Sequence, residues 1–137
     1  MIVHGSCVAL NGNGLLVLGA SGSGKSTLAL SLMAFDATLV ADDRVILDQD
    51  AGMVIASAPP AVRGLIEARG IGLLTCMPCD PVPVKLVVDM DETETERLPH
   101  SRTISLLGQQ LPLLRRVVGP QFLPGLVQLL KSGRFAP

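Results

Sequence analysis

The 137-residue sequence predicts a single α/β domain with a mixed β-sheet, one helix near the N-terminus and one at the C-terminus. Short apolar runs alternate with turn residues along most of the chain, which is typical of strands. Segments 25–35 and 119–131 instead have the character of helices. Apolar residues make up 48% of the chain and charged residues 17%, a balance that suits a packed core and excludes intrinsic disorder.

The first elements are predicted to be a β-hairpin followed by a loop and a helix. Segments 2–10 and 15–18 are apolar and flank the turn sequence Asn11-Gly12-Asn13-Gly14, which favours antiparallel pairing. A loop rich in glycine and serine fills 19–24. Leu28, Leu32 and Phe35 then recur at helical spacing, so we expect them to share one face of a helix over 25–35.

A strand over 38–41 follows and ends at Asp42-Asp43. Segment 62–68 is expected to be a short helix or irregular, because it follows Pro59-Pro60 and shows no clear alternation. The closing helix is expected over 119–131. Further strands are predicted over 45–47, 53–55, 71–75, 84–88, 104–107 and 111–114.

The charge and composition exclude several classes of partner. Eleven basic against twelve acidic residues give a net charge of −1, which offers no basic surface for nucleic acid. The uncharged stretch 5–24 contains too many glycines for a membrane span, and the N-terminus does not resemble a signal peptide. We therefore expect a cytoplasmic protein, in which the three cysteines are reduced.

The strongest chemical signal is the motif G-x-x-x-x-G-K-[ST], known as a P-loop, between an apolar strand and a helix. Its backbone N–H groups and the helix N-terminus can surround phosphates, Lys25 can reach the β- and γ-phosphates, and the Ser26 hydroxyl suits Mg²⁺. The predicted domain is thus a P-loop domain that binds ATP and Mg²⁺. The nucleotide-binding residues are Gly19, Ala20, Ser21, Gly22, Ser23, Gly24, Lys25, Ser26 and Thr27.

A pair of carboxylates, Asp42 and Asp43, comes at the end of the strand after the P-loop helix. If that strand neighbours the P-loop strand, its carboxyl end places both side chains near the γ-phosphate. One carboxylate could take a proton from an attacking hydroxyl, and the other could hold the metal. The alternative is a turn-forming pair at a strand exit.

Three further features have plain structural explanations. Segment 67–72 reads as an ordinary loop with a surface ion pair, and the lone His4 as a packed or exposed residue. Cys76 and Cys79 have C-x-x-C spacing, but a zinc site needs two more ligands and prolines surround the pair.

Taken together, these segments resemble the catalytic domain of bacterial HPr kinase/phosphorylase. The matching features are His4-Gly5, the P-loop 19–26, Leu39-Val40-Ala41-Asp42-Asp43 and Glu67-Ala68-Arg69-Gly70-Ile71-Gly72. The similarity is clear over residues 2–76 and weaker beyond. It implies an ATP-dependent kinase that phosphorylates a serine of HPr, or of an HPr-like phosphocarrier of the phosphotransferase system.

The resemblance also implies roles for individual residues. Asp43 would be the base that deprotonates the serine, and Lys25 would bind phosphate. Ser26 and Glu67 would be magnesium ligands, in addition to Asp42, whose place at the strand end already indicates a metal-binding role. His4 and Arg97 would be further catalytic residues, Arg97 by its place in Glu94-Thr95-Glu96-Arg97-Leu98.

The chain departs from the family pattern in two places. The family's N-terminal domain is missing, so residues 1–137 are read as a single catalytic domain of a short form. The family's Pro-Val-Arg-Pro-Gly-Arg segment is replaced by 111–116, which leaves the reverse phosphorolysis open. The family forms hexamers, and the uncharged segment 117–130 is compatible with a homo-oligomer.

The length favours a protein acceptor, because small-molecule kinases usually need lids that this chain has little length to supply. Two alternatives remain at this stage. One is a nucleotide-responsive module that binds ATP and a partner with little catalysis, and the other is a P-loop small-molecule kinase or ATPase.

Overall fold

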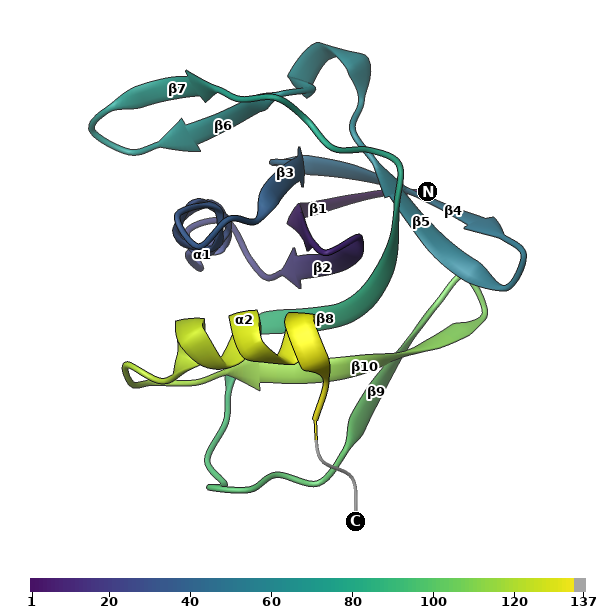
Figure 1. Ribbon diagram of the computed structural model, residues 1–137, viewed down its shortest axis with the longest axis vertical. Helices are drawn as coiled ribbons and strands as arrows, with labels where there is room; N and C mark the ends of the chain where they lie inside the picture. Colours follow the sequence, from purple (N-terminus) through teal and green to yellow (C-terminus); the bar gives the residue numbers. More distant parts are fainter. Residues whose placement is uncertain (135–137) are drawn as a thin grey trace.

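The computed structural model describes residues 1–134 and shows a mixed α/β fold with two α-helices (Figure 1). Eight strands form one sheet and two more form a separate hairpin. The elements are β1 (Ile2–Leu10), β2 (Asn13–Leu18), α1 (Lys25–Met33), β3 (Thr38–Ala41), β4 (Arg44–Asp50), β5 (Met53–Ser57), the 3₁₀ turn η1 (Pro60–Val62), β6 (Leu65–Ala68), β7 (Gly72–Thr75), β8 (Val82–Thr93), β9 (Arg102–Leu106), β10 (Gln109–Arg116) and α2 (Phe122–Ser132).

The large sheet closes into a ring through β8. Antiparallel pairs join β2 to β1, β1 to β4, β4 to β5 and β5 to β8. The ring is completed because β8 also pairs with β2, in parallel. Beyond this ring, β8 continues alongside β10, which in turn pairs with β9.

The predicted opening hairpin is confirmed. β1 and β2 pair in register from Leu10↔Asn13 to Gly5↔Leu18, across a turn at Asn11-Gly12. Both turn residues have positive φ, 52° and 77°, as a tight hairpin turn requires. The hairpin therefore sets where the loop after Leu18 leaves the sheet.

Strand β3 is not adjacent to β2, the arrangement under which Asp42 and Asp43 were expected to lie near the phosphates. It pairs with residues 7–9 of β1, so β1 lies between β2 and β3. Because β3 and β2 are both antiparallel to β1, they run in the same direction and their carboxyl ends still meet at one edge. The expected grouping of the P-loop with Asp42-Asp43 survives for this reason.

Helix α1 is shorter than predicted. It ends at Met33, and the turn that follows places Asp36 at a φ of 75°. Leu28 and Leu32 are buried as expected, whereas Phe35 is 48% exposed. Helix α2 begins at Phe122 rather than 119, and the Asn13 side chain donates a hydrogen bond to the Leu130 carbonyl near its C-terminal end.

Segment 62–68 contains a strand, not the predicted helix or irregular stretch. Residues 65–68 form β6, which pairs with β7 in an antiparallel hairpin closed by Arg69-Gly70-Ile71. Figure 1 shows this hairpin projecting away from the ring, close to α1. The other predicted strands are confirmed, and β8 runs on to Thr93, further than its apolar core suggests.

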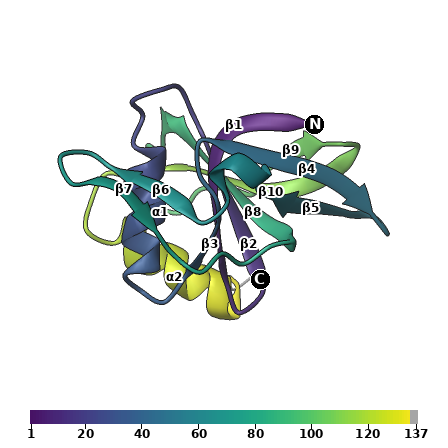
Figure 2. The same ribbon diagram turned by 90° about the horizontal axis from the view of Figure 1, so that it is seen from above.

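Two hydrophobic clusters hold the fold together. The helix-facing cluster packs α1 and α2 against the sheet and includes Val8, Leu15, Leu32, Leu39, Val88 and Leu126. The strand-only cluster includes Cys7, Leu16, Val40, Leu47, Val54 and Val87. Figure 2 shows α1 and α2 on the same side of the sheet. Neither of these helices, the only α-helices in residues 1–134, has the length and apolar character needed to cross a membrane.

Candidate functional site

The glycine-rich loop joins β2 to α1 and depends on glycine at two positions. Gly19 has a φ of 151°, and a Cβ there would lie 2.6 Å from the Ser23 Oγ and 3.1 Å from the Met90 Cβ. Gly24 has a φ of 96° and forms the N-cap of α1, with no side chain capping the helix. The first N–H groups of α1 therefore stay available to an anion.

Lys25 folds back across this loop. Its Nζ donates to the carbonyl oxygens of Gly19 at 2.7 Å and Ala20 at 2.9 Å. An ammonium group has three donors, so one remains after these two bonds. The two contacts hold the ammonium group at the loop and leave one N–H donor for a phosphate.

Asp91, which the sequence did not indicate as a site residue, stabilises the start of the loop. Both of its carboxylate oxygens accept from the Ala20 N–H, at 2.9 and 3.1 Å. Asp91 lies near the end of β8, which runs parallel to β2 and brings its carboxyl end to the same edge. No local pattern in the sequence reveals this contact, because it depends on the pairing of β2 with β8.

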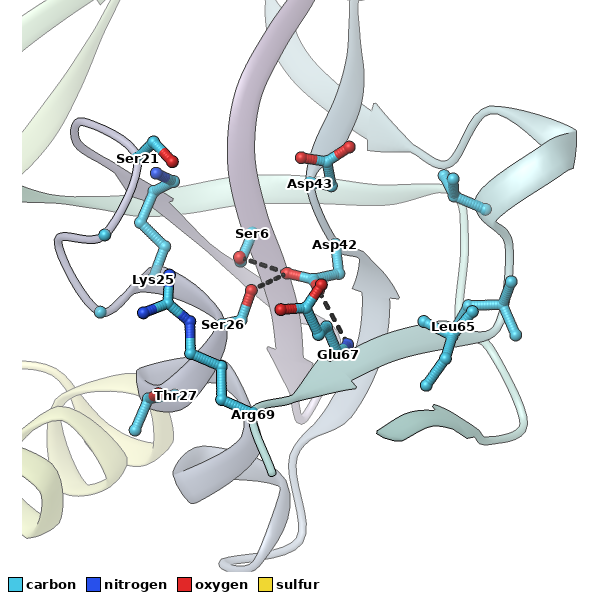
Figure 3. Close-up of a pocket in the computed structure, with 14 residues that line it drawn as sticks. Ser6, Ser21, Lys25, Ser26, Thr27, Asp42, Asp43, Leu65, Glu67 and Arg69 are labelled. Carbon is cyan, nitrogen blue, oxygen red and sulfur yellow. Dashed lines mark hydrogen bonds between the residues drawn. The ribbon is translucent and has the colours of Figure 1, made fainter. Parts of the chain in front are cut away.

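Asp42 is buried and accepts three hydrogen bonds. Its Oδ1 accepts from the Ser6 Oγ at 2.7 Å and from the Ser26 Oγ at 2.8 Å. Its Oδ2 accepts from the Glu67 backbone N–H at 3.3 Å. A single carboxylate thus ties the end of β3 to β1, α1 and β6 (Figure 3).

Asp43, in contrast to the buried Asp42, is exposed to solvent. Its side chain is 74% exposed, and its φ of 70° is in the left-handed region, which few residues other than glycine adopt. Its carbonyl accepts from the Gly5 N–H at 3.2 Å, which holds the strained turn against β1. Strained backbone of this kind clusters at functional sites.

The β6–β7 hairpin supplies the remaining wall of the site. Glu67 lies on β6, and Arg69 follows in the turn. Figure 3 shows the Glu67 carboxylate beside that of Asp42, and the Arg69 side chain extending toward the glycine-rich loop. Leu65 and Leu73 add an apolar border. The structure thus gives segment 67–72 a position at the site, where its residue types alone suggested an ordinary loop.

These elements enclose one cavity of about 540 Å³, the size of a small-molecule site. Nine of the predicted residues line it, together with Ser6, Val62, Leu65, Arg69 and Leu73. The predicted residues that line the cavity are Ser21, Gly22, Gly24, Lys25, Ser26, Thr27, Asp42, Asp43 and Glu67. Gly19, Ala20 and Ser23 shape the loop without lining the cavity.

The structure does not bring His4 and Arg97 to the cavity wall. His4 is exposed on β1 and pairs in register with Arg44. Arg97 is exposed in the connection between β8 and β9, which Figure 1 shows at the opposite end of the molecule from the β6–β7 hairpin. The roles predicted for these two residues receive no support from the geometry.

The oxygen atoms in the cavity suit a hard cation. The Ser26 hydroxyl and the carboxylates of Asp42 and Glu67 are the ligand types that Mg²⁺ prefers. No group of three or more His, Cys, Asp or Glu side chains within residues 1–134 is arranged to hold a metal.

The cysteines lie outside this chemistry. All three are free, and Cys7 is buried. Burial, and next the neighbouring Cys79, raise the pKa of the Cys7 thiol above its ordinary value, and burial raises the pKa of Cys76. Thiols of this kind stay protonated at neutral pH and react poorly.

Comparison with known proteins points to one family. Residues 1–80 match the model of the HPr serine kinase C-terminal domain. The chain is 45% identical over 76 residues to an HPr kinase/phosphorylase of Lactobacillus acidophilus, covering 55% of this chain and 24% of the relative. A relative with the same description in Caldicellulosiruptor bescii is 37% identical over 131 residues, covering 85% of this chain and 42% of that one.

The fold agrees with a solved structure. The HPr(Ser) kinase/phosphatase from Coxiella burnetii superposes with a TM-score of 0.76 and 25% identity, covering 96% of this chain and 93% of that chain. The chain spans only 24 to 38% of the length of the first curated relatives that it matches. The similarity to those relatives thus covers a minor part of each.

Proposed function

Because the chain belongs to the HPr serine kinase C-terminal domain family, we propose that it transfers the γ-phosphoryl group of ATP to a serine of HPr or an HPr-like phosphocarrier. The observation that carries this proposal is the shared cavity of Lys25, Ser26, Asp42 and Asp43. It combines an anion-binding helix start with one buried and one exposed carboxylate.

The glycine-rich loop and α1 would bind the phosphates of ATP. N–H groups at the start of α1 and the free donor of Lys25 stabilise the negative charge that spreads over the phosphoryl oxygens during transfer. Ser26, Glu67 and Asp42 would hold Mg²⁺, which supplies further charge neutralisation when bound. The contacts of Lys25 with the loop and the hydrogen bond from Ser26 to Asp42 already hold these side chains in place.

Asp43 would act as the general base. The serine oxygen attacks the γ-phosphorus, the bond from that phosphorus to the ADP oxygen breaks, and the serine proton passes to the Asp43 carboxylate. The exposure of Asp43 supports this role, because the acceptor arrives from solvent on another protein. Asp42 is less suited to it, because it is buried, with 4% of its surface exposed, whereas the acceptor serine arrives from solvent.

A protein acceptor also suits the mouth of the cavity. Leu73 is 64% exposed there, and Ile71 in the adjacent turn is 76% exposed. Apolar side chains at the border of a polar site are typical of a protein contact. Residues 111–116, the stretch of the sequence nearest to the family's phosphorolysis segment, lie within β10 and outside the cavity. We therefore propose the kinase direction as the function.

The decisive experiment is to incubate the protein with γ-labelled ATP, Mg²⁺ and purified HPr, and to locate the label by mass spectrometry. We expect label on a serine of HPr and none when that serine is replaced by alanine. Tight ATP binding without labelled HPr would favour the sensor, and turnover without any protein acceptor would favour a small-molecule kinase or ATPase.

Replacing Asp43 by asparagine tests the proposed base. Asp43→Asn keeps the size of the side chain but cannot take the proton, so we expect transfer to fall by about 100-fold or more while ATP affinity stays unchanged. The matched control is Asp48→Asn, because Asp48 is exposed on β4 outside the cavity. Wild-type transfer rates in Asp43→Asn would contradict this assignment.

A further inference from the structure

Ser6 is a buried hydroxyl without an evident function in the sequence. It lies on β1, is 1% exposed, and donates to the Asp42 Oδ1 at 2.7 Å. Within residues 1–134, Ser6 and Asp42 are the only polar or charged residues classed as buried, and they are bonded to each other. Burying a hydroxyl is costly unless it is hydrogen-bonded, so the pairing accounts for how Ser6 is tolerated in an apolar strand.

Ser6 and Ser26 share the same oxygen of Asp42. The two hydroxyls reach Oδ1 from β1 and from α1, at 2.7 and 2.8 Å. A carboxylate only accepts, so both serines donate their single hydroxyl proton to it. The Ser26 proton is therefore directed to Asp42, and the lone pairs of the Ser26 oxygen are left for the cavity.

The direction of the Ser26 hydroxyl depends on where the Asp42 carboxylate is held. The Glu67 N–H bond to Oδ2 is longer, at 3.3 Å, and comes from the projecting hairpin. The Ser6 bond comes from β1, a strand paired with β2, β3 and β4. Of these two supports, Ser6 is the shorter contact and is fixed to the more extensively paired element.

We propose that Ser6 is a positioning residue that holds Asp42 so that the Ser26 oxygen can bind a divalent cation carried in with the nucleotide. The inference rests on the proposed function, because it concerns the cation at the same site. Ser6 touches neither nucleotide nor cation in this proposal and acts through Asp42. Without the Ser6 hydroxyl, Asp42 keeps its bonds to Ser26 and Glu67 but loses its fixed orientation.

The test is the effect of Mg²⁺ on ATP affinity, measured by calorimetry with Mg²⁺ or with EDTA. For Ser6→Ala we expect the gain in affinity caused by Mg²⁺ to shrink about tenfold, the scale of one hydrogen bond to a charged group, and the affinity in EDTA to stay unchanged. Ser6→Thr keeps the hydroxyl and is expected to restore most of the gain.

The matched control is Cys7→Ala, because Cys7 is the next residue of β1, is also buried, and belongs to the strand-only cluster. It is expected to lower the melting temperature while leaving the Mg²⁺ gain intact. A full gain in Ser6→Ala, or an equal loss in Cys7→Ala, would overturn the proposal. If Ser6→Ala does not fold, Ser6→Cys replaces it, with a weaker donor of similar shape and an expected partial loss of the gain.

The same measurements separate this inference from the proposed function. A wild-type protein that gains no ATP affinity from Mg²⁺ would overturn both. A normal gain that Ser6→Ala diminishes, in a protein that never labels HPr, would support the role of Ser6 and remove only the kinase assignment.

Discussion

Lys25 illustrates how much a single side chain contributes at the residue scale. Its ammonium group bridges two carbonyl oxygens of the loop and retains one donor. It therefore both fixes the loop and offers positive charge to a bound anion. A lysine with all three donors bonded within the loop would stabilise the loop but would have no donor left for a phosphate.

We predict that Lys25→Ala lowers ATP affinity by about 10-fold or more, because it removes a charge-assisted hydrogen bond worth about 1.5–3 kcal/mol. Lys85→Ala is the control, since Lys85 is exposed on β8 and does not line the cavity. Titration calorimetry compares the two variants. Equal ATP affinities would contradict a phosphate-binding role for Lys25.

The residues proposed to bind or react with substrate were recognisable in the sequence, whereas the positioning residue Ser6 was not. Asp42, Asp43 and Lys25 stand in motifs whose spacing predicts their use, and all three line the cavity. Ser6 lies in a run that looks like any apolar strand. The available signal was that Ser6 shares a strand face with the buried Val8 and Leu10, where a polar side chain requires a partner.

At the scale of elements, the β6–β7 hairpin is the feature that the sequence predicted least well. Its first strand is four residues long and contains Glu67, and its turn follows with Arg69-Gly70. Too few positions alternate for a strand to be distinguished from a loop. The hairpin becomes evident only when β7, which was predicted, is seen to pair with it.

We predict that the hairpin contributes to acceptor affinity. Leu73→Ser is expected to raise the KM for HPr by about 10-fold and to leave the KM for ATP unchanged, because covering an exposed leucine is worth about 1.5–3 kcal/mol. Val118→Ser is the control, since Val118 is 72% exposed and does not line the cavity. Steady-state kinetics with each substrate varied in turn would distinguish them, and an unchanged KM for HPr would exclude Leu73 from the contact.

At the scale of the whole molecule, one sheet contributes side chains to two hydrophobic clusters, one on each of its faces. The adjacent residues Leu15 and Leu16 of β2 point to opposite faces, one into the helix-facing cluster and one into the strand-only cluster. Both are fully buried. The two clusters therefore share their backbone, and neither can be lost without affecting the other.

We predict that Leu15→Ala and Leu16→Ala each lower the free energy of unfolding by about 2–5 kcal/mol, the usual cost of truncating a core leucine. Because the clusters share β2, each variant is expected to unfold in a single transition, with coinciding melting curves from far-ultraviolet circular dichroism and from calorimetry. Two separated transitions in either variant would contradict this view of one cooperative core.

The element order was largely predictable from one sequence, and the pairing was not. Apolar runs and the Asn11-Gly12 turn locate most strands and the first hairpin. The parallel pairing of β2 with β8 joins segments about 70 residues apart in the chain, and nothing local encodes it. For the same reason, the sequence could not predict the hydrogen bond from the Ala20 N–H to Asp91. Nor could it predict that β1 lies between β2 and β3.

The position of β8 in the chain has a consequence for biosynthesis. Every residue that lines the cavity lies between Ser6 and Leu73, yet the strand that closes the ring comes later, at 82–93. A nascent polypeptide that has left the ribosome only as far as residue 80 still exposes the edges of β2 and β5 to which β8 will pair. The ring around the site can therefore form only after β8 has been synthesised and has paired. Until then, the unpaired edges of β2 and β5 are accessible to chaperones.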